Sequence, residues 1–147
     1  MNPTHADMDL DAESEAKLRQ VLEHDPQHPR DAYLFIFAGL ARAQQEVIAD
    51  AGAGRDRHVG GADLLEALRD LALEEFGPLA FRVLAEWNIH RTDDFGRLIF
   101  GLVDAGLLSV TAEDSMADFV DGYDFTAAFV EPFAETGEMP TGLPPIT

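Results

Sequence analysis

The chain has 147 residues, of which 46% are hydrophobic, enough for one domain with a substantial core. It contains no cysteine, which excludes disulfide bonds, thiolate metal ligands and cysteine nucleophiles. Its 28 acidic and 10 basic residues give a formal net charge of -18, a field that repels the phosphates of nucleic acids.

The two ends of the chain differ from its middle. The acidic segment 1–16 has neither the basic nor the apolar part of a signal peptide, and no apolar run reaches the ~18 residues that a membrane span needs. We therefore expect a cytoplasmic protein with no membrane partner. Residues 1–10 are expected to be a flexible N-terminus, 11–133 a single helical domain, and the Gly- and Pro-rich residues 134–147 a flexible tail.

The spacing of apolar residues predicts helices from residue 11 onwards. The first covers residues 11–24, with Asp11 as its N-cap. The second runs from Arg30 to Ala49 and is apolar nearly all round, so we expect it to be the most buried element. Its main apolar stripe consists of Tyr33, Ile36, Phe37, Leu40, Val47 and Ile48.

Three further helices are predicted to follow with short joints. One covers residues 62–76, and Gly77 and Pro78 end it and start the next, since proline suits a first helical turn. Thr92 is a good N-cap for a helix over residues 92–105, and Gly106 is typical of the left-handed residue that follows a helix. The phenylalanines Phe125, Phe129 and Phe133, four residues apart, predict a last short helix on the core.

The region after Gly106 allows two interpretations. Three helices followed by a short apolar segment, a turn and an aromatic segment is the order of a winged helix, which predicts a small β-hairpin near 107–123. The alternative is irregular chain with a short helix over a bundle. The fold class we expect is mainly α, a single compact domain of five or six helices, with a winged-helix-like arrangement as one of its two interpretations.

The loop before residue 62 is a candidate anion site. Arg55, Arg57 and His58 are its densest basic cluster, and Gly60 and Gly61 lead into a predicted helix N-terminus. Free backbone N–H groups, the helix dipole and two guanidiniums favour a phosphate or carboxylate. The sequence is neither a Walker loop nor a dinucleotide fingerprint. The alternative is a flexible connection whose arginines pair with the acidic surface.

No catalytic or metal-binding residues are predicted. The histidines do not stand in an HExxH frame, and the acidic pairs are explained by helix capping and turns, as with Asp93 and Asp94. The trio Asp118, Asp121 and Asp124 is interpreted in the same way. We expect no cofactor and favour a protein that is not an enzyme.

The predicted helix 92–105 is the centre of a candidate interaction surface. In a winged helix it would be the recognition helix, and its one basic residue among acidic ones suits a protein rather than DNA. Phe81 and Phe100 lie off the main apolar stripes, so they either cover a neighbouring helix or line an exposed patch. The candidate surface consists of Phe81, Asp93, Asp94, Arg97, Phe100 and Asp104.

Five ordered segments of the chain carry a family resemblance: AYLFIF, RHVGGADLLEALR, FGPLAFRVLAEWNI, TDDFGRLIFGLVDAGLL and DFVDGYDFTAAF. They resemble a family of short uncharacterised bacterial proteins, the Minf type, found largely in planctomycetes and verrucomicrobia. The resemblance covers roughly residues 15–130 and implies no activity, substrate or catalytic residue. The resemblance predicts a hydroxyl residue near position 60 as a helix cap, where this chain has Gly60.

These observations favour a non-enzymatic, cytoplasmic protein-interaction module with a strongly acidic surface, acting on a protein partner or as a homodimer, and not on nucleic acid. The acidic surface either serves solubility alone, or it mimics nucleic acid or recruits a basic partner. The alternative function is a regulatory domain that binds a small anion at Arg55–Gly61.

Overall fold

The computed structural model confirms the mainly helical fold. It describes residues 2–3, 11–51, 59–109 and 114–134. The α-helices in that part of the chain are α1 (Ala12–His24), α2 (Arg30–Ala51), α3 (Gly61–Phe76), α4 (Ala80–Glu86), α5 (Thr92–Asp104), α6 (Phe125–Phe129) and α7 (Glu131–Ala134). Two short 3-10 helices, η1 (Gly77–Leu79) and η2 (Met116–Phe119), and two short strands, β1 (Asn2–Pro3) and β2 (Leu108–Ser109), complete it.

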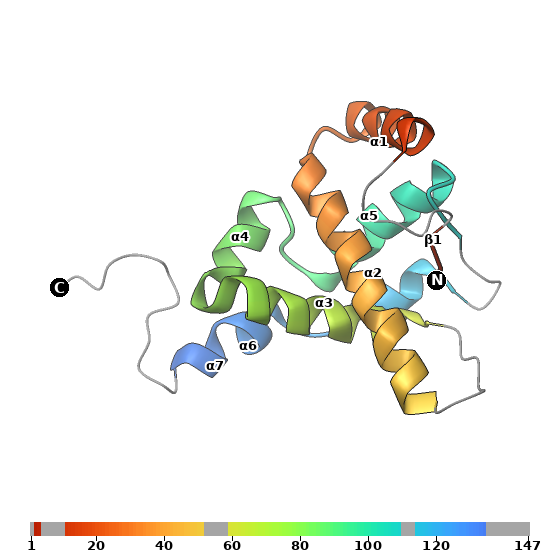
Figure 1. Ribbon diagram of the computed structural model, residues 1–147. Helices are drawn as coiled ribbons and strands as arrows, with labels where there is room; N and C mark the ends of the chain where they lie inside the picture. Colours follow the sequence, from red (N-terminus) through yellow and green to blue (C-terminus); the bar gives the residue numbers. More distant parts are fainter. Residues whose placement is uncertain (1, 4–10, 52–58, 110–113, 135–147) are drawn as a thin grey trace.

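The long helix α2 runs through the middle of the molecule (Figure 1). It packs most extensively against α3. In the view of Figure 1, α1 lies above the start of α2, α5 to its right, and α4, α6 and α7 to its left. The core contains residues of α2, α3 and α5 above all, and among the described elements α2 contributes the largest set of buried hydrophobic side chains. Ile48 is a correction to the predicted stripe, because its side chain is 64% exposed.

Gly39 allows α2 and α3 to approach each other closely. A Cβ atom at position 39 would clash with the side chain of Leu68, coming within 2.9 Å of its Cγ. The absence of a side chain there is therefore a packing requirement, since backbone and leucine occupy the space that a methyl group would need.

The helix ends show which capping predictions were correct. Asp11 is the N-cap of α1, and its carboxylate accepts a hydrogen bond from the Ser14 N–H at 2.8 Å. Gly106 follows α5 with φ of +82°, and the Leu107 N–H donates to Leu102 O at 2.9 Å, the predicted glycine ending. The end of α4 has the same pattern with Asn88, whose φ is +64°, a position that the sequence analysis did not single out.

His28 fastens the turn between α1 and α2 to the end of α4. The side chain is 2% exposed, and its Nδ1 lies 2.9 Å from Trp87 O. Because a carbonyl oxygen only accepts, Nδ1 must carry the proton and donate. Its Nε2 lies 3.9 Å from Asp25 Oδ2 and has no hydrogen-bond partner among the described residues.

The hairpin interpretation of 107–123 was wrong, as far as that segment is described. Leu108 and Ser109 pair antiparallel with Pro3 and Asn2, at the other end of the chain, rather than with residues near 120. Residues 116–119 form η2, which packs against α5. The alternative, irregular chain with a short helix, is what the structure contains, so α5 has no wing beside it within the described residues; 110–113 lie outside them.

The last predicted helix is divided in two at Val130, where α6 ends and α7 begins. Pro132 explains the division, because it has no N–H to donate to the carbonyl four residues earlier and its ring crowds that carbonyl. Phe125 and Phe129 are buried, as predicted, whereas Phe133 is only partly buried. The predicted flexible segments 1–10 and 134–147 lie outside the described residues except for 2–3 and Ala134.

Candidate functional site

The predicted anion site lies mostly outside the described residues, which include only its Gly60 and Gly61. The Gly60 N–H donates to Asp63 Oδ2 at 2.8 Å, so a carboxylate of the chain itself caps the start of α3. Gly61 is buried against Asp118, whose Cβ would lie 2.6 Å from a Cβ at position 61. The anion site at Arg55, Arg57 and His58 remains a prediction.

The six residues of the predicted interaction surface lie in different surroundings in the structure. Phe81 and Asp93 line the same hollow. Phe100 is partly buried and stands edge-on to Phe119, with ring centroids 6.1 Å apart. Asp104 lines a second hollow, and Arg97 is exposed beside Asp94.

Asp94 was predicted to be exposed, and this was wrong: the residue is 8% exposed. Its carboxylate accepts from the His90 N–H at 2.8 Å and from the Arg91 N–H at 3.3 Å, and Arg97 donates to it at 3.2 Å. Asp94, and not Thr92, therefore caps α5, because the carboxylate three residues into the helix reaches back to the preceding backbone.

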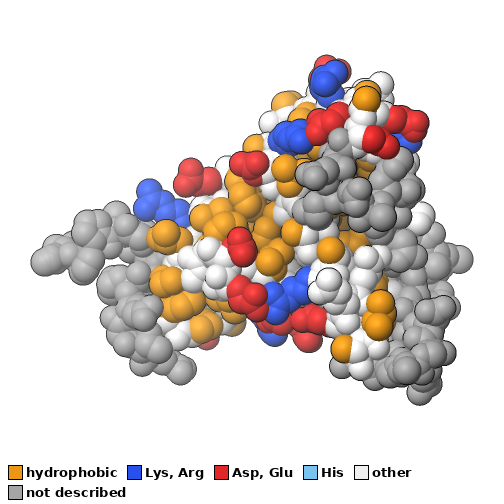
Figure 2. Space-filling view, in the orientation of Figure 1, with side chains coloured by type: hydrophobic (Ala, Val, Ile, Leu, Met, Phe, Trp, Pro, Cys, Tyr) orange, Lys and Arg blue, Asp and Glu red, His pale blue; other side chains and the backbone are white. Residues whose placement is uncertain are grey.

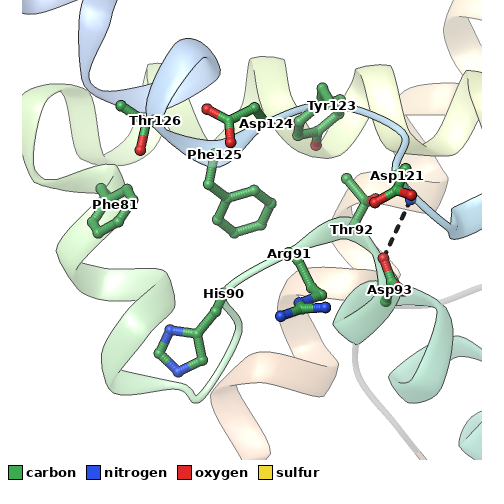
Figure 3. A pocket seen from close by; sticks show the side chains of 10 residues that line it. All are labelled: Phe81, His90, Arg91, Thr92, Asp93, Asp121, Tyr123, Asp124, Phe125 and Thr126. Atoms are coloured by element: carbon green, nitrogen blue, oxygen red, sulfur yellow. Dashed lines mark hydrogen bonds between the residues drawn. The ribbon is translucent and has the colours of Figure 1, made fainter.

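The hollow that contains Phe81 and Asp93 is the candidate functional site. It has a volume of about 470 Å3 and lies between α4, the link from α4 to α5, and the segment 121–126 (Figure 3). That volume is within the range of ligand pockets in proteins. The residues that line it are Phe81, His90, Arg91, Thr92, Asp93, Asp121, Tyr123, Asp124, Phe125 and Thr126.

Thr92 joins the two sides of this hollow. Its buried hydroxyl donates to Phe119 O at 2.6 Å and accepts from the Gly122 N–H at 2.8 Å. Asp93 adds a third connection, because its Oδ1 accepts from the Asp121 N–H at 3.3 Å (Figure 3). Segment 119–122 is thereby held against the start of α5, although the two are separated by about thirty residues in sequence.

The acidic side of the hollow consists of Asp93, Asp121 and Asp124. Asp121 has a φ of +51°, in the left-handed region where aspartate and asparagine are among the few tolerated side chains. Asp124 is the N-cap of α6, accepting from the Ala127 N–H at 2.9 Å. None of the three carboxylates has an ion pair with another described residue.

Aromatic rings form the wall of the hollow. The Phe125 ring projects between Phe81 and His90 on one side and Thr92 and Asp121 on the other (Figure 3). It is 5% exposed and packs against Phe129 and Tyr123, with centroids 5.0 and 6.0 Å away. The Tyr123 hydroxyl donates to Leu65 O at 2.9 Å, and burial raises the pKa of Tyr123, so this donor stays protonated. These contacts hold the rings of Tyr123 and Phe125 in place.

Arg91 and His90 bring basic nitrogen atoms to the opposite side of the hollow (Figure 3). Arg91 is exposed, and its guanidinium forms no ion pair with a described residue. His90 Nε2 lies 3.1 Å from Asn88 Oδ1. The lining thus combines three carboxylates with one guanidinium, and it remains net negative.

A second hollow of about 480 Å3 lies where α1, α2 and α5 meet. Val21, Tyr33, Gly101 and Ala105 provide its apolar surface, and Asp104 lies among the remaining lining residues. Burial and the nearby Asp25 raise the pKa of Tyr33 to about 12. Gly101 faces open space at this hollow, because a Cβ there would meet no other atom within 4 Å.

Sequence reasoning did not include most of the residues that line the first hollow. His90, Arg91, Tyr123 and Phe125 were not named as site residues, and Asp121 and Asp124 were interpreted as turn residues. One signal was present: the segment DGYDFT alternates carboxylates with aromatic rings from Asp121 to Phe125. That pattern places both kinds of side chain on one short surface segment.

Within the described residues, no three His, Asp or Glu side chains converge as metal ligands, and no helix is long and apolar enough to cross a membrane. Comparisons with protein-family models, with curated proteins and with solved structures find no match. The family resemblance seen in the motifs therefore remains a prediction.

Proposed function

We propose that the protein is a non-enzymatic interaction module that binds a basic segment of a protein partner at the hollow between the α4–α5 link and segment 121–126. The observation that supports this proposal most directly is the composition of the lining. Asp93, Asp121 and Asp124 face the same space as Phe81, Tyr123 and Phe125. Carboxylates attract ammonium and guanidinium groups, and aromatic faces bind the same groups through their ring electrons.

The net charge of the whole chain also favours a basic partner. A net charge of -18 attracts basic partners over several ångströms and raises the rate at which they associate. The local excess of carboxylates in the hollow then gives the approaching segment a place to dock. The overall field alone would attract any cation equally, so the hollow is what provides selectivity.

A peptide segment suits the surroundings of the hollow better than an enclosed small molecule. Phe81 is 36% exposed, and Leu79 and Val120, close in sequence to lining residues, are 45% and 48% exposed. On the face shown in Figure 2, hydrophobic side chains reach the surface over the middle of the molecule, with acidic side chains beside them. Exposed apolar residues around a charged pocket are typical of protein interfaces.

The test is a binding titration with a labelled peptide in which arginines alternate with leucine and glycine, followed by fluorescence polarisation. The site variant combines Asp93→Asn and Asp121→Asn, which together remove two negative charges. The amide oxygen at position 93 can still accept the hydrogen bond from the backbone N–H of residue 121. Asparagine also tolerates the left-handed backbone of Asp121. We expect this variant to bind the peptide about five-fold or more weakly than the wild type.

The matched control combines Glu13→Gln and Glu23→Gln, which change the net charge by the same amount on α1, an element that does not line the hollow. We expect this control to change affinity less than about two-fold, because distant exposed charges are largely screened. Equal weakening by the two double variants would show that only the overall charge matters and would reject the proposed site.

A further inference from the structure

We infer that the hollow receives a single arginine side chain of the partner, and not a lysine. This inference rests on the proposed function and names the group that is recognised. The planar guanidinium lies against the aromatic wall and donates to the carboxylates on the acidic side. The argument depends on the remaining acceptor capacity of those carboxylates, on the fixed rings, and on the shape of the two cationic side chains.

The carboxylates retain acceptor sites for a ligand. Asp93 Oδ1 and Asp124 Oδ2 each accept one backbone N–H within the chain, from Asp121 and from Ala127. An ionised carboxylate has roughly four lone-pair positions, so each can accept further hydrogen bonds. A guanidinium has five N–H donors in a planar fork and can engage two carboxylate oxygens at once, whereas an ammonium is a point charge.

The aromatic wall also favours a guanidinium over an ammonium. Phe125 is held in place by Phe129 and by Phe95, whose ring centroid lies 5.8 Å away. Phe81, on the opposite side of the hollow from Asp121, is partly exposed and can close over a bound group (Figure 3). A guanidinium stacks on such rings with its flat face and sheds its weakly held water at lower cost than an ammonium.

Arg91 does not prevent a cation from binding. It contributes one positive charge against the three carboxylates that line the same space. The Arg91 guanidinium can also donate hydrogen bonds to the backbone carbonyl groups of a bound peptide. A free guanidinium ion has no such carbonyl groups. We therefore expect the hollow to prefer an arginine within a peptide backbone over guanidinium alone.

Capped single residues test this inference, because they carry one side chain and little overall charge. The probes are N-acetyl-arginine N-methylamide, the lysine analogue, and the citrulline analogue, which has nearly the shape of arginine without its charge. Binding is followed by the shifts of backbone amide resonances in two-dimensional NMR. We expect the arginine probe to shift the amides of residues 91–93 and 121–126, the lysine probe to bind about five-fold or more weakly, and citrulline to cause no shifts.

Phe81→Ala is the variant that separates specific stacking from attraction by charge. Phe81 is partly exposed, so its removal leaves the core intact, and Leu79→Ala is the control at an exposed position outside the lining. Phe81→Ala should bring the affinity for arginine down to that for lysine, and Leu79→Ala should leave the difference unchanged.

The two proposals fail in different ways. Equal affinity for the arginine and lysine probes, or shifts spread over the whole acidic surface, would overturn the arginine pocket. If basic peptides still bind the wild type more tightly than the Asp93→Asn, Asp121→Asn variant, the proposed interaction module is supported even though the arginine pocket is rejected. Loss of that peptide difference, together with shifts elsewhere, would reject both.

Discussion

Thr92 shows how the role of one residue depends on parts of the chain that are distant in sequence. Its residue type and position favour a helix N-cap, but Asp94 performs the capping, and the Thr92 hydroxyl bonds Phe119 O and the Gly122 N–H instead. A hydroxyl both donates and accepts, so this one group can satisfy two backbone atoms. Local sequence contains no information about these two partners, which are about thirty residues away.

The two tyrosines lead to a prediction at alkaline pH. Burial raises the pKa of Tyr33 to about 12 and also raises the pKa of Tyr123. A tyrosine in the unfolded chain loses its proton near pH ~10, so folding is favoured below that value, and this contribution is lost as the pH rises from about 10 towards 12. We expect the free energy of unfolding to fall across this window, by on the order of 2 kcal/mol for each buried tyrosine.

Tyrosinate absorbance and helical circular dichroism, recorded in one pH titration, check this expectation. Both tyrosines should ionise together with the loss of helical signal, and Tyr33→Phe or Tyr123→Phe should each make stability less dependent on pH. Ionisation of both tyrosines near pH ~10 in a protein that keeps its helices would contradict the burial argument.

At the scale of elements, local sequence patterns predicted where the helices begin and end, but not which distant segment a short strand pairs with. The bounds of α1 and α5 lie within one residue of the prediction, because apolar periodicity and end signals such as Asp11 and Gly106 are local. The strand partner of residues 108–109 was not predictable in this way, since short apolar segments pair with whatever strand lies beside them, and the predicted hairpin near 107–123 was wrong. Here that strand is Asn2–Pro3, which no pattern near residue 108 indicates.

The close contact between α2 and α3 gives the prediction at this scale. Gly39→Ala should destabilise the protein by roughly 1–3 kcal/mol, because the new methyl group would occupy the space of Leu68. Gly101→Ala in α5 is the matched control, since its methyl group meets open space. Alanine there should be neutral or stabilising by up to about 1 kcal/mol, because it favours a helix over glycine.

Urea denaturation followed by circular dichroism measures both changes. The structure requires a clear difference between them, with only the Gly39 variant unfolding at lower urea concentration. Two equal losses would mean that helix propensity, and not the approach of α2 to α3, governs both positions.

At the scale of the whole molecule, apolar periodicity predicted the mainly helical class, whereas the site depends on the folded chain. Hydrophobic content indicated a globular protein, and net charge indicated an acidic one, but neither quantity locates a site. Phe81 and Asp93 were recognised as site candidates, and in the structure they line one hollow with Asp121 and Asp124, whereas Phe100, Arg97 and Asp104 do not line it. That grouping depends on the Thr92 and Asp93 hydrogen bonds between α5 and segment 119–122.

The overall charge predicts no detectable binding to double-stranded DNA near physiological salt. Contacts of Lys and Arg with phosphates dominate the affinity of DNA-binding proteins, and this chain has no Lys or Arg after Gly106. Arg55 and Arg57 are too few for useful binding against a net charge of -18. A polarisation titration with labelled duplex measures this, with the arginine peptide as a positive control for active protein.

Lower salt should not produce DNA binding, because weaker screening lengthens the repulsion as well as the attraction. Micromolar affinity for the duplex that weakens with added salt, and that the double change Arg55→Ala and Arg57→Ala abolishes, would overturn the preference for basic protein partners.

Trp87 gives the molecule a built-in optical reporter. It is the single tryptophan of the chain, and it ends α4 between the rings of Phe35 and Phe76, with centroids 5.6 and 5.7 Å away. Its carbonyl accepts the His28 hydrogen bond, and only Asn88 and Ile89 separate it from His90 at the hollow. Its intrinsic emission therefore responds to the packing of α2, α3 and α4 on one side and to a neighbour of the candidate hollow on the other, so that unfolding and binding at the hollow can both be followed in the unlabelled protein.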